Sequence, residues 1–345
     1  MLSLEKTKIK RTADRICIIF VSRSKYIRFF ENKGYYLCFL FLFLQKNVMR
    51  FISSVSLWLK AARPKTLPAS LSPVLLGCAL AYRDNGGMLL LVPAVLCFLV
   101  ALFAQIASNF ANDYFDFKKG ADGADRLGPE RAVAQGWIKP KDMLKATVIT
   151  LVLACLFGCM LIPYGGWELV PVGLAIAVCV LAYSTGPYPL AYNGLGDVCV
   201  LLFYGIVPVC FTYYVQCLHF SLLSLLLSIA LGVLSVNILI VNNYRDYYQD
   251  KAVGKRTSIV IFGRTFGKYI YLLNGIIAVA LIFPLLLNAS IIFILLFSAF
   301  FVLFVKSWID LSRLEGRALN KVLGDTARNE FVFALILSLF LIFGI

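Results

Sequence analysis

The chain has 345 residues, of which 61% are hydrophobic and 15% are charged. Soluble domains are about half apolar and about a quarter charged, so this composition argues against a soluble globular enzyme. The net charge of +15 is typical of a membrane protein whose Lys and Arg residues lie in cytoplasmic loops. Ten cysteines without a Cys-x-x-Cys pair, and one histidine, indicate small packing residues rather than disulfides or a zinc site.

The first 48 residues differ from the rest of the chain. They are basic and irregular, apart from an apolar run at 35–44 that is too short to cross a bilayer. Met49 opens an amphipathic stretch and is the expected initiator. Residues 1–48 are therefore predicted to be a non-native or disordered extension before a membrane domain at 49–345. The alternative is a genuine interfacial anchor.

Apolar stretches predict an all-α, polytopic fold with nine transmembrane helices around a central cavity that opens to the cytoplasmic side. A spanning helix needs about 20 apolar residues, and membrane helices tolerate internal Gly and Pro. The predicted spans are 67–83, 88–110, 143–163, 168–184, 196–214, 219–241, 268–287, 290–308 and 329–345.

The loops between these spans alternate in character. The long loops at 113–142 and 242–268 and the stretch at 306–328 are rich in Lys and Arg, whereas Arg83 is the only basic residue of the short opposite loops. By the positive-inside rule the long loops face the cytoplasm, which gives an N-in, C-out topology. The basic excess then reports orientation, and nucleic acid is not an expected partner.

A cluster of acids and amides closes the second span. Asn109, Asn112, Asp113 and Asp116 are spaced i, i+3, i+4 and i+7, so they are predicted to share one helical face. Carboxylate and amide oxygens at one helix end are ligands for a hard cation such as Mg²⁺, which shares its shell with substrate phosphates. We expect a metal site here, with Lys118, Lys119 and Arg131 near the phosphates.

A matching cluster closes the sixth span. Asn242, Asp246 and Asp250 are spaced i, i+4 and i+8 along one face, and Lys255 and Arg256 follow in the loop. Two such stripes, each followed by basic residues, indicate a site for divalent metal and diphosphate rather than chance solvated helix ends.

The loop at 183–197 is rich in Tyr, Gly and Pro and has no Lys or Arg. Its turn-forming residues predict an ordered segment. Two interpretations stay open: an interfacial turn with aromatic anchors, or a wall of the acceptor pocket that includes Tyr183.

Taken together, these segments resemble the UbiA-type intramembrane prenyltransferases, and within them the branch that prenylates 1,4-dihydroxy-2-naphthoate in menaquinone biosynthesis. The resemblance covers about 56–345. It rests on Trp58–Thr66, Asn112–Asp122, Arg126–Gly136, Asn242–Asp246, Gly254–Thr257 and Leu319–Arg328.

The resemblance implies a bacterial inner-membrane enzyme that transfers a polyprenyl group from its diphosphate to 1,4-dihydroxy-2-naphthoate, with loss of CO₂ and diphosphate and with Mg²⁺ as cofactor. Asp113, Asp116, Asp246 and Asp250 would be catalytic, and Arg63 or Lys65 would bind the acceptor carboxylate. The alternatives are 4-hydroxybenzoate or another aromatic acceptor and, from a different class, a divalent-cation transporter, which would place its ionisable groups at mid-membrane.

Overall fold

The computed structural model describes residues 55–120, 126–287 and 289–344. The predicted 1–48 extension, its apolar run at 35–44 and the predicted boundary at Met49 lie outside these ranges. Leu57–Ile345 forms one compact unit, and the account below concerns that unit.

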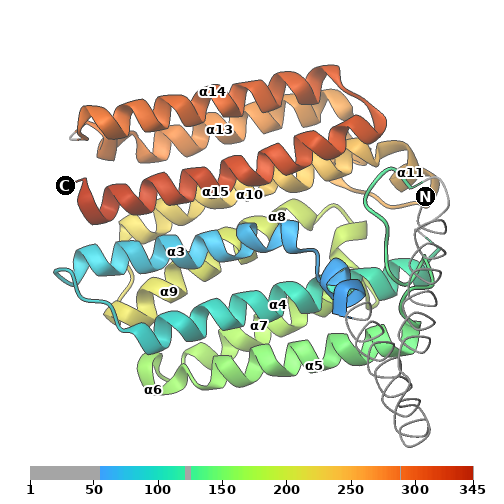
Figure 1. The fold of residues 1–345 in the computed structure, drawn as a ribbon, viewed down its shortest axis with the longest axis horizontal. Coiled ribbons are helices and arrows are strands. Elements are labelled where there is room, and N and C mark those ends of the chain that lie inside the picture. The colour runs from blue at the N-terminus through green and yellow to red at the C-terminus, as the bar shows by residue number, and fades with distance from the viewer. Residues whose placement is uncertain (1–54, 121–125, 288, 345) are drawn as a thin grey trace, which may run out of the picture. The chain divides into compact units, whose positions relative to one another are not determined.

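Its described residues are helical, with short connections (Figure 1). The longer helices are α3 (Leu67–Asp84), α4 (Leu91–Lys118), α5 (Pro140–Cys159), α7 (Leu169–Ala182), α9 (Val207–Cys217), α10 (Leu222–Arg245), α13 (Arg264–Leu286), α14 (Ile291–Arg313) and α15 (Leu319–Phe343). The shorter ones are η1 (Pro64–Thr66), α6 (Ile162–Gly165), η2 (Leu190–Tyr192), α8 (Gly196–Leu201), the π-helical η3 (Leu202–Ile206), α11 (Tyr247–Ala252), α12 (Ser258–Phe262) and η4 (Gly316–Ala318).

Seven stretches of the described ranges are long and apolar enough to cross a membrane. They are Leu91–Lys118, Pro140–Gly165, Gly196–Cys217, Leu222–Arg245, Arg264–Leu286, Ile291–Arg313 and Gly316–Phe343. The other two predicted spans coincide with α3 and with α7, a shorter apolar helix. The prediction of an all-helical polytopic membrane fold is therefore confirmed, while the structure supports seven spans by length and composition.

Two helices extend beyond their predicted spans for a simple reason. The span predicted to end at 110 belongs to α4, which continues to Lys118 and ends just before Gly120, whose φ of +70° favours glycine. The last predicted span begins at 329, but α15 begins at Leu319. Charged residues end an apolar window without ending a helix, so both helices carry polar turns outside their apolar part.

The helices pack side by side along their length. Helix α4 packs on α5, α3 contacts both α9 and α15, and α10 contacts α13 and α15 (Figure 1). The C-terminal ends of α4 and α10 lie at the same end of this bundle, together with α11, on the right of Figure 1. The two polar clusters are therefore brought to one end of the unit.

A π-helical turn between α8 and α9 allows one close helix contact. Gly205 lies in this turn against Gly232 of α10, and a Cβ added at Gly205 would come within 2.5 Å of the Gly232 Cα. Small residues at such contacts let membrane helices approach closely. The turn also sets the position of Tyr204, which matters for the site.

Candidate functional site

A cavity of about 990 Å³ lies inside the bundle and is lined by residues of α3, α4, α5, α7, α9, α10 and the connecting loops. At one end it is bordered by the polar ends of α4 and α10. Away from that end its walls are apolar, with Val74, Leu161, Leu169, Phe211 and Val215 among the lining residues. The cavity can thus take an amphiphile with a charged head and a long apolar tail.

The stripe on α4 divides between the cavity and the protein interior. Asn109, Asn112 and Asp116 line the cavity, but Asp113 does not. A helix turns about 100° per residue, so Asn112 lies about 60° to one side of Asn109 and Asp113 about 40° to the other. The cavity lies on the Asn112 side, and this leaves Asp113 facing away from it.

Asp113 instead binds backbone amides. Its side chain is 1% exposed, and its Oδ2 and Oδ1 accept hydrogen bonds from the N–H groups of Ala132 and Val133 at 3.0 and 3.2 Å. The sequence predicted a metal ligand and catalytic group at this position. In the structure this side chain instead anchors the 126–138 segment. The local spacing on α4 could not show this, because it does not tell where that later segment folds.

The anchored segment carries Arg131 to the cavity. Its Nη2 lies 2.8 Å from Oδ2 of Asp116, and its Nη1 donates to the carbonyl oxygen of Asn112 at 2.6 Å. Both side chains of the ion pair are largely buried. Arg131, predicted to bind phosphate, is therefore paired in the structure with Asp116, predicted to bind metal.

The α10 cluster is organised by Arg245, which is 3% exposed. Its Nε and Nη2 donate to the two oxygens of Asp246 at 2.7 and 2.6 Å, and Nη2 also donates to Asn242 at 2.8 Å. Its Nη1 donates to Asn320 of α15 at 2.8 Å. Such a forked pair is among the strongest ionic contacts, and it fixes Asp246 and Asn242 at the cavity wall.

Asp250 and Lys255 form the third acid–base pair, with 3.2 Å between Nζ and Oδ1. Burial raises the pKa of Asp250, and Lys255 opposes that rise. Within the described residues, the buried Oδ2 of Asp250 has no hydrogen-bond partner. Both residues line the cavity, so this pair borders any ligand bound there.

The 183–197 loop joins the two clusters. The Tyr192 hydroxyl donates to Oδ1 of Asp116 at 2.9 Å, and the ring of Tyr192 lies 4.0 Å from Nζ of Lys119 and 5.6 Å from Nζ of Lys255. Ser184 donates its hydroxyl proton to Asn112. Tyr183, Ser184 and Tyr192 line the cavity, which favours the pocket-wall interpretation of this loop.

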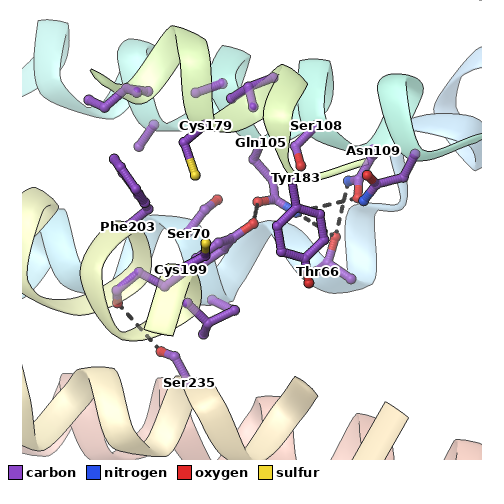
Figure 2. A pocket seen from close by; sticks show the side chains of 18 of the residues that line it. Thr66, Ser70, Gln105, Ser108, Asn109, Cys179, Tyr183, Cys199, Phe203 and Ser235 are labelled. Atoms are coloured by element: carbon purple, nitrogen blue, oxygen red, sulfur yellow. Dashed lines mark hydrogen bonds between the residues drawn. The ribbon is translucent and has the colours of Figure 1, made fainter. Parts of the chain in front are cut away.

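Farther inside, uncharged polar groups face the cavity (Figure 2). Tyr204 donates to Gln105, and Gln105 in turn donates to Thr66 at 3.3 Å. Asn109 donates to the carbonyl oxygen of Ala62 at 3.0 Å and to Thr66 at 3.3 Å. These bonds use the amide nitrogen and fix the orientation of Asn109, whose Oδ1 accepts a long hydrogen bond from Gln105 at 3.5 Å.

Of the remaining basic residues predicted for the site, some line the cavity and others do not. Arg63 lines the cavity, and burial and the nearby Arg131 lower its pKa to about 9, so it stays charged near neutral pH. Lys118 and Arg256 are exposed and do not line the cavity. Lys119 donates to the Ser184 carbonyl oxygen at 2.7 Å instead. The side chain of Lys65 is not among those described.

Several lining residues were not singled out from the sequence. Gln105 and Tyr204 have no distinctive local spacing, and Asn320 lies 75 positions from its partner Arg245. Only the motif-like context of Asn320, within Leu319–Arg328, could have drawn attention to it.

Comparison with known protein families gives a match to the UbiA prenyltransferase family over residues 70–339. The chain belongs to the UbiA prenyltransferase family. It is therefore a multi-pass integral membrane protein and a prenyltransferase, as its motifs predicted.

Curated relatives of this UbiA-family chain include 1,4-dihydroxy-2-naphthoate octaprenyltransferases. That of Mycobacterium tuberculosis is 34% identical over 298 residues, which cover 85% of this chain and 99% of the relative. That of Escherichia coli is 38% identical over 220 residues, 61% of this chain and 70% of the relative. Human UbiA prenyltransferase domain-containing protein 1 is 31% identical over 83% of this chain and 82% of its own length.

Solved UbiA structures share the fold. A UbiA homologue from Archaeoglobus fulgidus bound to GPP and Mg²⁺ superposes with a TM-score of 0.60 at 19% identity, over 83% of this chain and 99% of that one. The homologue from Aeropyrum pernix K1 gives 0.59 at 14% identity, over 80% and 96%.

The oxygen ligands of this chain fit a metal that is shared with a substrate. In the described part of the chain, no three His, Cys, Asp or Glu side chains come together as a metal cage. Mg²⁺ is usually held by one or two carboxylates, waters and substrate phosphates. Asp116, Asp246 and Asp250 supply carboxylates of this kind at the cavity.

Proposed function

We propose that this protein transfers a polyprenyl group from polyprenyl diphosphate to 1,4-dihydroxy-2-naphthoate, releasing diphosphate and CO₂ and giving demethylmenaquinol. The observation that carries the proposal is one cavity that joins three acid–base pairs at its polar end to a long apolar wall. The names of the curated relatives support the acceptor, and the dimensions of the cavity support an amphiphilic donor.

The diphosphate would lie between α4 and α10. Asp116 and Asn112 would supply metal ligands on one side, and Asp246, Asp250 and Asn242 on the other. Mg²⁺ bound there neutralises the negative charge that develops on diphosphate as the allylic C–O bond breaks. Arg131 and Lys255, which now pair with Asp116 and Asp250, would turn to the phosphate oxygens and add to this stabilisation.

Two further residues would act indirectly. Asp113 would hold Arg131 in reach of the diphosphate through the amides of Ala132 and Val133. Arg245 would hold Asp246 in one orientation through its forked contact. In this proposal Asp113 is a positioning residue, and Asn109 supports the wall through its bonds to Thr66 and Ala62.

The allyl cation must be kept from water until the acceptor attacks. The apolar walls exclude water, and the faces of Tyr183 and Tyr192 border the cavity where aromatic rings stabilise cations. Arg63 would bind the acceptor carboxylate, as could Lys65. Lys118, Lys119 and Arg256 would act only at the rim, by attracting the diphosphate to the site.

For topology, we propose nine transmembrane helices, with α3 and α7 completing the seven longer stretches, in a bacterial inner membrane. The N-terminal side and the polar end would face the cytoplasm, because the basic loops lie at that end. Labelling of single cysteines placed in the 126–138 segment and after α3 with an impermeant maleimide tests this. Labelling of the cysteine in the 126–138 segment from outside intact cells would show that the orientation is the opposite of the one proposed.

The activity test uses the purified protein in detergent with Mg²⁺, a labelled prenyl diphosphate and each aromatic acid. We expect CO₂ release and a prenylated product with 1,4-dihydroxy-2-naphthoate. Turnover of 4-hydroxybenzoate instead would show that the protein prenylates that acceptor and not the naphthoate. Failure with every acceptor, together with Mg²⁺ uptake into vesicles, would favour a transporter, although the acids lie at helix ends rather than at mid-membrane.

A further inference from the structure

Asn320, in the first turn of α15, has no part in the mechanism above, although it lines the cavity. Its Oδ1 accepts a hydrogen bond from Nη1 of Arg245 at 2.8 Å. Its Nδ2 donates to the carbonyl oxygen of Leu127 at 2.9 Å. One side chain therefore connects three parts of the chain that are far apart in sequence: α15, α10 and the 126–138 segment that follows α4.

Gly128, the next residue of that segment, lies against the guanidinium group of Arg245. A Cβ added at Gly128 would lie 2.7 Å from Nη2 and 3.1 Å from Cζ of Arg245, so one of the two groups would have to move. The guanidinium cannot move without loss, because it already donates to Asp246, Asn242 and Asn320. Glycine at position 128 thus lets the segment pack on a fixed arginine.

The segment is consequently held on both sides of Arg131. On one side the 127–128 pair contacts α15 and α10, and on the other the amides of 132–133 bind Asp113 of α4. The two polar clusters lie on α4 and α10, so the segment joins one cluster to the other at the polar end of the bundle (Figure 1). The backbone around Arg131 is therefore fixed relative to both clusters, although its ion pair reaches only Asp116.

The contacts of Asn320 favour a role in positioning over direct contact with a ligand. Its oxygen and its nitrogen are each turned to a protein partner at less than 3.0 Å. An amide can accept from a guanidinium and donate to a carbonyl oxygen at once, whereas an ionised carboxylate can only accept. The amide at this position therefore matches Arg245 on one side and the backbone of Leu127 on the other.

We infer that Asn320 and Gly128 hold the 126–131 segment between the two polar clusters, and that Asn320 is a positioning residue for the diphosphate, acting through Arg131. This inference rests on the proposed function and adds the contact that keeps the two sides of the diphosphate site in register. Without it, Arg131 is held from the α4 side alone. Arg63, proposed to bind the acceptor, lies outside this segment.

The test combines hydrogen–deuterium exchange with ligand binding. Exchange of the peptide that contains 127–133 is measured without substrates in wild type and in Asn320→Ala. The Kd for inorganic diphosphate in the presence of Mg²⁺ is measured by calorimetry, and KM is measured for prenyl diphosphate and for the acceptor. Asn329→Ala is the matched control, because it removes an amide of the same helix that bonds to Leu303 and Ser307 of α14.

We expect Asn320→Ala to speed exchange at 127–133. The Kd for diphosphate and the KM for prenyl diphosphate should rise about 10-fold, the upper end for one lost hydrogen bond, while the KM for the acceptor stays within twofold. Asn329→Ala should lower the unfolding temperature without changing that exchange or either KM. Gly128→Ala leaves α15 unchanged and should reproduce the effects of Asn320→Ala, so it carries the test if that variant does not fold.

Three results would overturn the inference. Exchange at 127–133 as in wild type would show that Asn320 does not hold the segment. Faster exchange with an unchanged Kd for diphosphate would show that the segment does not position Arg131. Equal rises in KM for both substrates, or the same changes in Asn329→Ala, would show a general loss of stability. If wild type prenylates no acceptor, the proposed function fails, and the exchange and the Kd for diphosphate still decide the role of Asn320.

Discussion

Replacing Asp113 with Asn separates an anchoring role from a metal-binding role. In the structure both carboxylate oxygens accept backbone hydrogen bonds, from Ala132 and Val133. An amide keeps one acceptor and turns an NH₂ group against the other N–H. A hydrogen bond to a charged group contributes about 1.5–3 kcal/mol, so local opening around these residues should become about 10- to 150-fold more frequent.

Hydrogen–deuterium exchange of the peptide that contains 131–133 measures this opening. Exchange should speed up in Asp113→Asn, and KM for prenyl diphosphate should rise because Arg131 lies in the released segment. The matched control is Asp250→Asn, which neutralises a cavity-lining carboxylate whose partner is Lys255 and should weaken Mg²⁺ without changing that exchange. A lowered Mg²⁺ affinity in Asp113→Asn, with exchange as in wild type, would refute the anchoring role.

Other predictions concern packing, the ion pairs and the metal. Arg245→Lys keeps the positive charge but loses the fork that holds Asp246. It should lower the unfolding temperature and the activity together, since a lost hydrogen bond to a charged group costs about 1.5–3 kcal/mol. Gly205→Ala should destabilise the protein in a thermal-unfolding assay, whereas Gly324→Ala, with no neighbour within 4 Å of its added Cβ, should not. Tyr192→Phe should reduce kcat about fivefold, as expected for one lost hydrogen bond. Chelation of Mg²⁺ should abolish turnover and weaken diphosphate binding, and added Mg²⁺ should restore both.

Most of the fold was predictable because hydropathy and helical period are local properties. Nine apolar stretches located nine helices, and the i, i+3, i+7 spacing located Asn109, Asn112 and Asp116 on one cavity face. The same spacing placed Asp113 with them. Asn112 and Asp113 lie at opposite edges of this helical face. Which of the two edges meets the cavity depends on where the following segment of the chain packs.

The pairing within the site was not predictable for a related reason. Arg131 reaches Asp116 from fifteen residues further along the chain, and Asn320 reaches Arg245 from another helix. The sequence shows which cations follow the acidic clusters along the chain, but not which of these side chains reach the cavity. Lys118 and Lys119 follow the α4 cluster directly, yet neither lines the cavity, whereas the anchored segment brings Arg131 back to it.

The three acid–base pairs have a consequence for how ligands are bound. Before any ligand arrives, the carboxylates of Asp116, Asp246 and Asp250 are each neutralised by a neighbouring cation. A free anion meets cations that are already engaged, and a free metal ion meets carboxylates that are engaged too. In the proposed mechanism the partners would exchange when both ligands arrive together, so that no buried charge is left alone. Each ligand would then strengthen the binding of the other by the same factor. We therefore expect the cavity to bind metal and diphosphate together more tightly than either one alone.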